Sequence, residues 1–186
     1  MKGAKIILGV DPGTTIMGYG VVEISGTQAL IKVWDVIALN KIKDHTLKLK
    51  QIFESTLKLI EAYQPDEMAV EAPFYGKNVQ SMLKLGRAQG VVMAGALYRN
   101  IPIAEYSPRK IKQSITGNGS ASKEQVALMM EKTFRCRLEH RYNDATDGLA
   151  VALCHHYQST HRGLNGSGGS QSWKNFIANN PGKVKG

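Results

Sequence analysis

The stretch IILGVDPGTTIMGYGVV, residues 6–22, decides how the fold of this chain is interpreted. Its first apolar run has the length of a strand and ends on one carboxylate, Asp11, before Pro12-Gly13 turns the chain into a second apolar run. Asp11 alone has two interpretations, because an Asp side chain often caps the backbone of a turn. It is either an ordinary turn residue or a charge held at the end of a strand for chemistry.

The length and composition of the chain indicate one domain with one core. The chain has 186 residues, of which 42% are hydrophobic, so it is too short for two sizeable domains. No apolar run approaches the roughly 20 residues that span a bilayer, and the N-terminus reads as a first strand rather than a signal peptide. Two cysteines, Cys136 and Cys154, make no disulfide framework. We therefore expect a reduced, cytoplasmic protein without membrane contact.

The charge of the chain points to a polyanionic partner. Lys and Arg number 24 against 15 Asp and Glu, which gives a net charge of +9. A basic excess of this size favours nucleic acid or an acidic membrane face, although many basic proteins bind neither. Residues 159–186 are rich in Gly, Ser and Asn and contain no acid. We interpret them as a basic tail without fixed structure, following a single domain at residues 1–158.

The order of strand and helix patterns predicts a mixed sheet. Three strands in succession, joined by short glycine-containing turns, are typical of an antiparallel meander. A helix, a fourth strand, a long helix, a fifth strand and three further helices follow. The predicted strands cover residues 5–10, 18–24, 28–38, 67–71 and 101–106, and the predicted helices cover 46–63, 78–99, a short segment from 108, 122–134 and a segment from 143. This order fits the ribonuclease H-like α/β fold, a mixed five-stranded sheet flanked by helices.

Four acids stand where these elements begin or end. Asp11 ends the first strand, Glu71 ends the fourth, and Asp144 opens the last helix with Asp147 three residues later. Residues i and i+3 share one face of a helix, so Asp144 and Asp147 point the same way. If the first and fourth strands pair in parallel, Asp11 and Glu71 emerge side by side at one edge of the sheet. The helix could then bring its two acids against them.

Four converging carboxylates need a cation, because they would otherwise repel one another and raise their own pKa values. An all-oxygen ligand set suits Mg²⁺ or Mn²⁺. Two such ions, roughly 3.5–4 Å apart, can activate a water and stabilise the leaving oxygen of a phosphodiester. Asp11 would then bridge both ions, Glu71 would hold one, and Asp144 and Asp147 the other. Taken singly, each acid also fits a bland role, such as favourable charge near a helix N-terminus.

Four blocks of the sequence resemble the bacterial RuvC Holliday junction resolvases, in order and at that family's spacing. The blocks are ILGVDPGTTIMGYGVV, AVEAPFYGKNVQSMLKLGRAQGVV, EYSPRKIKQSITGNGSASKEQV and DATDGLAVALCH. The resemblance covers residues 5–157. It implies a homodimeric, Mg²⁺-dependent endonuclease of DNA recombination and repair that nicks two opposing strands of a four-way junction symmetrically. It also implies the RuvA–RuvB branch-migration complex as a partner.

The resemblance also assigns roles to residues. Asp11, Glu71, Asp144 and Asp147 fall on the family's catalytic acids. Phe74 falls on an aromatic residue that stacks on a base near the crossover, and every base offers a face for such stacking. The cations that fall on or near DNA-contacting positions of the family are Lys77, Lys84, Arg87, Lys112 and Lys123. Lys112 and Lys123 would lie beside the attacked phosphate.

The chain departs from the family in the long helix. The family commonly reads LKLGQARG where this chain has LKLGRAQG, so Arg87 and Gln89 stand exchanged. That exchange leaves open which face of the helix presents the cation.

Three other functions compete with this interpretation. One is a different nuclease on the same fold, acting on RNA–DNA hybrids or other branched DNA, and another is a non-catalytic junction-binding module. The third is an actin-like ATPase, because a strand, an acid and Gly13-Thr14-Thr15 resemble the phosphate loop of those enzymes. Actin-like kinases need two duplicated lobes, and no second copy of the opening motif is present.

Overall fold

The computed structural model describes residues 3–73, 78–138 and 143–164, with the side chains of 143 and 161–164 excepted. A compact unit extends to His156, and residues from Tyr157 onward form a second unit, of which the end of one helix is described. The predicted boundary at residue 158 and the predicted tail stay predictions, because residues 165–186 lie outside the described part. The last helix continues to Leu164.

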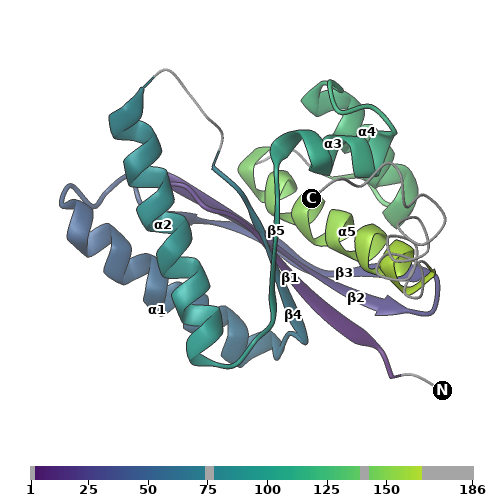
Figure 1. The fold of residues 1–186 in the computed structure, drawn as a ribbon, viewed down its shortest axis with the longest axis horizontal. Coiled ribbons are helices and arrows are strands. Elements are labelled where there is room, and N and C mark those ends of the chain that lie inside the picture. Colours follow the sequence, from purple (N-terminus) through teal and green to yellow (C-terminus); the bar gives the residue numbers. More distant parts are fainter. Residues whose placement is uncertain (1–2, 74–77, 139–142, 165–186) are drawn as a thin grey trace, which may run out of the picture. The chain divides into compact units, whose positions relative to one another are not determined.

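A five-stranded sheet in the order β3-β2-β1-β4-β5 forms the centre of the compact unit (Figure 1). The strands are β1 (Lys5–Asp11), β2 (Ile16–Ser25), β3 (Gln28–Ala38), β4 (Glu67–Glu71) and β5 (Ile103–Tyr106). The first three strands form an antiparallel meander, and β4 and β5 run parallel to β1. The predicted ribonuclease H-like topology is confirmed.

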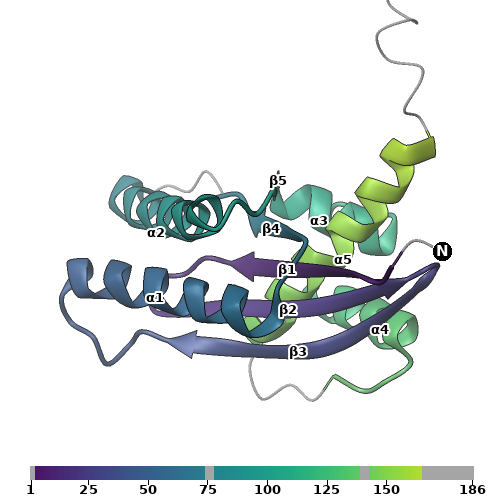
Figure 2. The same ribbon diagram turned by 90° about the horizontal axis from the view of Figure 1, so that it is seen from below.

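Helices cover both faces of this sheet (Figures 1 and 2). Helices α1 (His45–Tyr63) and α2 (Val79–Tyr98) lie on one face, and α3 (Pro108–Thr116), α4 (Lys123–Phe134) and α5 (Asn143–Leu164) lie on the other. Capping side chains begin four of them, α1 to α4. Asp44 accepts a hydrogen bond from the backbone N–H of Leu47 at 2.8 Å, and Ser122 and Gln125 form a capping box at α4. Ser107 caps α3 ahead of a proline at its first turn.

Two strands differ from prediction by two residues at their start. β5 begins at Ile103 rather than at 101, because Pro102 has no N–H to donate and contributes only its carbonyl to Met68. β2 begins at Ile16, because Ile16 and Met17 pair with the end of β3, and its pairing with β1 continues to the end of that strand, where Asp11 lies opposite Gly18. Asp11 therefore ends a paired strand rather than belonging to a loose turn.

The two faces of the sheet are built from different residues. Alternate residues of β1 and β4 pack into a core with α1 and α2, and these include Leu8, Val10, Met68 and Val70, each at most 1% exposed. The intervening residues of the same strands face α5, because successive strand side chains point to opposite faces.

Glycines on this second face let α5 lie directly on the sheet. A Cβ added at Gly9 would come within 2.3 Å of the carbonyl oxygen of Gly148, and one at Gly18 within 1.8 Å of that of Asp144. A Cβ at Gly20 would come within 2.5 Å of Cα of Leu149. Any side chain at these positions would hold the helix away. The glycines therefore bring the N-terminal turns of α5 against the ends of β1 and β2.

Candidate active site

The four predicted acids come from three elements that meet at one edge of the sheet. Asp11 and Glu71 are the last residues of β1 and β4, which pair in parallel as expected. Asp144 and Asp147 lie in the first turns of α5, the helix that the glycines hold against the sheet. Strand pairing therefore fixes the positions of Asp11 and Glu71, and the packing of α5 on the sheet fixes the positions of Asp144 and Asp147.

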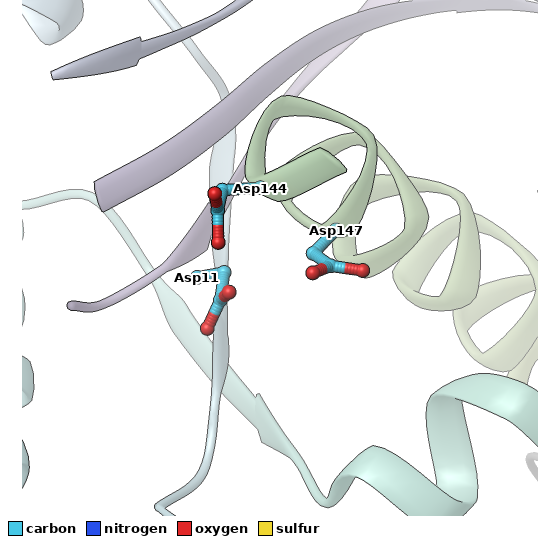
Figure 3. Close-up of side chains that lie close together, drawn as sticks. All are labelled: Asp11, Asp144 and Asp147. Carbon is cyan, nitrogen blue, oxygen red and sulfur yellow. The ribbon is translucent and has the colours of Figure 1, made fainter. Parts of the chain in front are cut away.

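Three of the acids form a close group. Carboxylate oxygens of Asp11, Asp144 and Asp147 lie within 4.8 Å of one another, and all three side chains are half-buried. Figure 3 shows Asp11 on the end of its strand, facing the two acids of α5. Glu71 does not belong to this close group, but it lines the same pocket.

The pocket has a volume of about 380 Å³ and combines acids, cations and apolar walls. Its charged lining consists of Asp11, Glu71, Asp144, Asp147, Lys112 and Lys123. Apolar side chains from α3, α4 and α5 complete it, namely Pro108, Ile111, Val126 and Ala150. A second pocket of about 260 Å³ shares Asp11, Glu71 and Asp144 and extends toward α2. The acids therefore stand between two hollows, one on each side.

Without a cation, burial and mutual repulsion favour the protonated forms of Asp11 and Glu71. Burial, together with the charges of Asp147 and Asp144 and against the opposing charge of Lys123, raises the pKa of Asp11 to about 7. Burial likewise raises the pKa of Glu71 to about 8, together with the charges of Asp11 and Asp147. Bringing a divalent cation among them would favour the ionised forms.

Lys123 supplies one positive charge at the site. Its Nζ lies 2.6 Å from Oδ2 of Asp147, and this hydrogen bond raises the pKa of the lysine although partial burial opposes the rise. Lys123 begins α4, where the Ser122 cap fixes its backbone. Lys112 of α3 lines the same pocket and, like Lys123, lowers the pKa of Glu71. Both predicted lysines thus lie at the acids.

The residues present fit a hard divalent cation. The close group offers only carboxylate oxygens, and the raised pKa values of Asp11 and of neighbouring Glu71 show that the nearby lysines do not balance the negative charge. Oxygen ligands in this number suit Mg²⁺ or Mn²⁺ rather than Zn²⁺, which favours nitrogen and sulfur. The Asp cluster is therefore a candidate metal site.

Comparison with known proteins agrees with this arrangement. The family model described as crossover junction endodeoxyribonuclease RuvC matches residues 7–155, which span all four acids and both lysines. The chain belongs to the RuvC family.

Relatives in this family are similar over nearly the whole chain. The crossover junction endodeoxyribonuclease RuvC of Bacteroides fragilis is 57% identical over 183 residues, covering 97% of this chain and 96% of the relative. That of Porphyromonas gingivalis is 55% identical, covering 97% of each chain. The solved structure of Thermus thermophilus RuvC is 29% identical with a TM-score of 0.77, covering 84% of this chain and 96% of that one. The same RuvC has also been solved in complex with Holliday junction substrate, and that structure matches with a TM-score of 0.78.

The remaining residues predicted to contact DNA fall in two places. Phe74 and Lys77 lie outside the described residues. Lys84 and Arg87 are exposed on α2. The exchange of Arg87 and Gln89 relative to the RuvC pattern has a structural counterpart. Gln89 is buried, and its Nε2 donates a hydrogen bond to Oε2 of Glu105 at 2.7 Å. Of the two exchanged positions, 87 is therefore exposed and carries the cation, whereas 89 points inward and carries a neutral amide.

Some site residues were missed by sequence reasoning. Ala150 lines the larger pocket one helical turn after Asp147, a spacing that could have signalled it. Gln89 lines the smaller pocket with Leu85, four residues earlier on the same face of α2. The apolar walls contributed by Ile111 and Val126 carried no chemical signal in the sequence, because they read as ordinary core positions.

Proposed function

We propose that this RuvC-family chain is a Mg²⁺-dependent endonuclease that resolves four-way DNA junctions by symmetric paired nicks. The observation that carries the proposal is the close group of Asp11, Asp144 and Asp147, with Glu71 in the same pocket. A cluster of this kind, in a basic chain of this family, suits hydrolysis of a phosphodiester.

Each acid has a distinct part in this proposal. Asp11, half-buried between the strand ends and α5, would be shared by two cations. Glu71 would hold one cation from β4, and Asp144 and Asp147 would hold the other from α5. Mg²⁺, or Mn²⁺ in its place, supplies the charge that activates a water and stabilises the leaving oxygen when bound.

The two lysines would position the phosphate. Lys112 and Lys123 line the pocket on α3 and α4, next to the acids and open to solvent. An ammonium group there attracts a phosphate oxygen and offsets the charge that develops on it. Lys123 also holds Asp147 by its 2.6 Å hydrogen bond, so it orients an acid as well as the substrate.

Junction binding would extend beyond the pocket and would use two copies of the chain. Symmetric nicks in a substrate with two-fold symmetry need two sites, which implies a homodimer. Phe74 would stack on a base near the crossover, and Lys77, Lys84 and Arg87 would contact the phosphate backbone. The Thermus thermophilus RuvC structure with Holliday junction substrate supports this substrate class. Like others of its family, the protein would act in the cytoplasm with the RuvA–RuvB complex.

Cleavage of a synthetic four-way junction tests the proposal. The wild-type chain and Asp11→Asn are incubated with the junction and Mg²⁺, and binding is measured separately by gel shift. We expect the wild type to make paired nicks and the variant to bind without cutting. Equal cleavage of an RNA–DNA hybrid would favour a different nuclease on this fold, and absence of metal-dependent nicks on any DNA would favour a binding module. Normal cutting by Asp11→Asn would show that the site is elsewhere.

A further inference from the structure

A buried polar cluster joins α5 to three strands at a distance from the acids. His155 of α5 is 7% exposed, and its Nε2 contacts Oε2 of Glu67 on β4. Its Nδ1 lies 2.7 Å from the hydroxyl of Tyr106 on β5. Lys5 of β1 reaches Oε2 of Glu67 at 2.7 Å. One imidazole is thus tied to β4 and β5 directly and, through Glu67, to β1.

The charges in the cluster are consistent with a fixed set of donors and acceptors. Burial alone would raise the pKa of Glu67, but hydrogen bonds from Lys5 and His155 lower it below its usual value. Glu67 is therefore a carboxylate that accepts from the Nε2–H of His155. In the neutral imidazole, Nδ1 is then the acceptor and Tyr106 donates its hydroxyl hydrogen.

Helix α5 needs such a directional contact because part of its contact with the sheet lacks interlocking side chains. Glycines of β1 and β2 lie against the backbone of α5 at Gly148 and Leu149. Backbone packed on backbone has no interlocking side chains to oppose sliding along the helix axis. The acids at the start of α5 also repel Asp11, which pushes the helix away from its position. A directional contact elsewhere on α5 can resist both.

The spacings on the helix and on the strand match. Asp147 and His155 are eight residues apart on α5, which is about 12 Å at the rise of a helix. Glu67 and Glu71 are four residues apart on the same face of β4, which is about 13 Å at the rise of a strand. Fixing His155 on Glu67 therefore fixes Asp147 near Glu71.

Tyr106 connects the same two elements from β5. It pairs with Glu71 in the sheet, and its carbonyl oxygen accepts a hydrogen bond from the N–H of Ala72 at 2.9 Å. Its side chain, 8% exposed, bonds to His155. A single residue thus holds the end of the strand that carries Glu71 and the helix that carries Asp147.

From this geometry we infer that Tyr106, His155 and Glu67 are positioning residues that set the register of α5 and thereby the spacing of the metal-binding acids. The inference rests on the proposed metal site and adds to it a second group of residues that touches neither metal nor DNA. Loss of one of these contacts should loosen the acid group without unfolding the chain. Outer partners of this kind typically change metal affinity by about 10- to 100-fold.

Tyr106→Phe is the sharpest test, because it removes one hydroxyl and keeps the ring. Thr56→Val is a matched control, since it removes a buried hydroxyl that bonds to the carbonyl of Ile52 at 2.8 Å on the opposite, α1 side of the sheet. Mn²⁺ binding to the metal-free proteins is measured by calorimetry, and their melting temperatures are measured in parallel. We expect both variants to melt at lower temperature and Tyr106→Phe alone to bind Mn²⁺ about tenfold more weakly.

Two substitutions at Glu67 test whether a conservative replacement preserves the Mn²⁺ affinity. Glu67→Gln keeps an oxygen that accepts from His155, whereas Glu67→Ala removes it. Mn²⁺ affinity close to wild type in the first variant, with a loss of about tenfold in the second, supports positioning. Unchanged Mn²⁺ affinity in Tyr106→Phe and Glu67→Ala, or an equal loss in Thr56→Val, would overturn the inference. The proposed function is judged separately, since it fails if wild-type protein binds Mn²⁺ and cuts no junction.

Discussion

The two faces of the central sheet use the same strands for different purposes. Toward α1 and α2, the strands present large apolar side chains such as Leu8 and Met68, which are fully buried. Toward α5, the same strands also bury Ile7, but next to the acids they present glycine and carboxylates, and there the helix lies on the backbone itself. The first face contributes hydrophobic stabilisation, and the second gives up side-chain packing at its glycines, which bring the acids close together.

The alternation of a strand makes this division possible. In β1, Leu8 and Val10 face the core, whereas Gly9 and Asp11 face α5. A shift of one residue in register would exchange the two sets, so the apolar face also fixes where Asp11 points. The division predicts that substitutions on one face reduce stability and those on the other reduce metal binding.

The largest effect is expected on the acid face, from Asp147→Asn. Nicking of a four-way junction should fall on the order of 10²–10³-fold or more, because one ligand of the metal site loses its charge. The melting temperature without metal should change little, since Asp147 is bonded to a lysine that is itself 62% exposed. Asp35→Asn, an exposed acid on β3, is the control with the same charge change. Equal losses of activity in both variants would contradict the division.

On the apolar face, Leu8→Ala should reduce stability and leave metal binding intact. Truncating a fully buried leucine in a packed core costs about 2–5 kcal/mol in the free energy of unfolding. Urea denaturation gives this loss, and Mn²⁺ calorimetry well below the unfolding transition gives the affinity of the folded fraction. A weakened Mn²⁺ affinity would show that the two faces are coupled more tightly than proposed.

A smaller loss of stability is expected from Gly20→Ala, accompanied by a loss of metal affinity. The added methyl would overlap Cα of Leu149 and push α5 from the sheet, at a cost of about 1–3 kcal/mol. Gly86→Ala on α2 is the control, because an added Cβ there has no atom of the described residues within 4 Å and alanine favours a helix. If both substitutions behaved alike in thermal melting, close contact at Gly20 would have no energetic role.

The most gradual effect is that of pH on the metal-free protein. Asp11 and Glu71 have pKa values raised to about 7 and about 8 in the folded chain, from 3.8 and 4.5. Between about pH 4 and pH 8 the folded state therefore binds more protons than the unfolded state, and the free energy of unfolding falls as pH rises. The slope is at most about 1.4 kcal/mol per pH unit for each acid. Melting curves across this range should show the decline in stability in the absence of Mg²⁺. The same curves with Mg²⁺ should not show it.

Local signals in the sequence predicted most of the fold. Apolar alternation, the capping box at Ser122 and the turn at Gln64-Pro65 each act over a few residues, so they can be read directly. The placement of Asp11 and Glu71 at parallel strand ends also followed from element order. Strand starts were less predictable, because they depend on pairing partners, as at Ile16, which pairs with Ala38 at the end of β3.

The geometry of the site was less accessible from the sequence. Gly9, Gly18 and Gly20 read as turn or strand glycines, and only the packed structure shows that they seat α5. His155 contacts Tyr106, which lies 49 positions earlier in the sequence, and Glu67, which lies 88 positions earlier. No local pattern links these residues.

Anomalous scattering from crystals of the protein soaked in Mn²⁺ would test the metal site most directly. We predict density between the carboxylates of Asp11, Asp144 and Asp147, with a second ion beside Glu71. Manganese bound away from these four acids, or no manganese at millimolar concentration, would contradict the assembly of a metal centre on the glycine-lined face of the sheet.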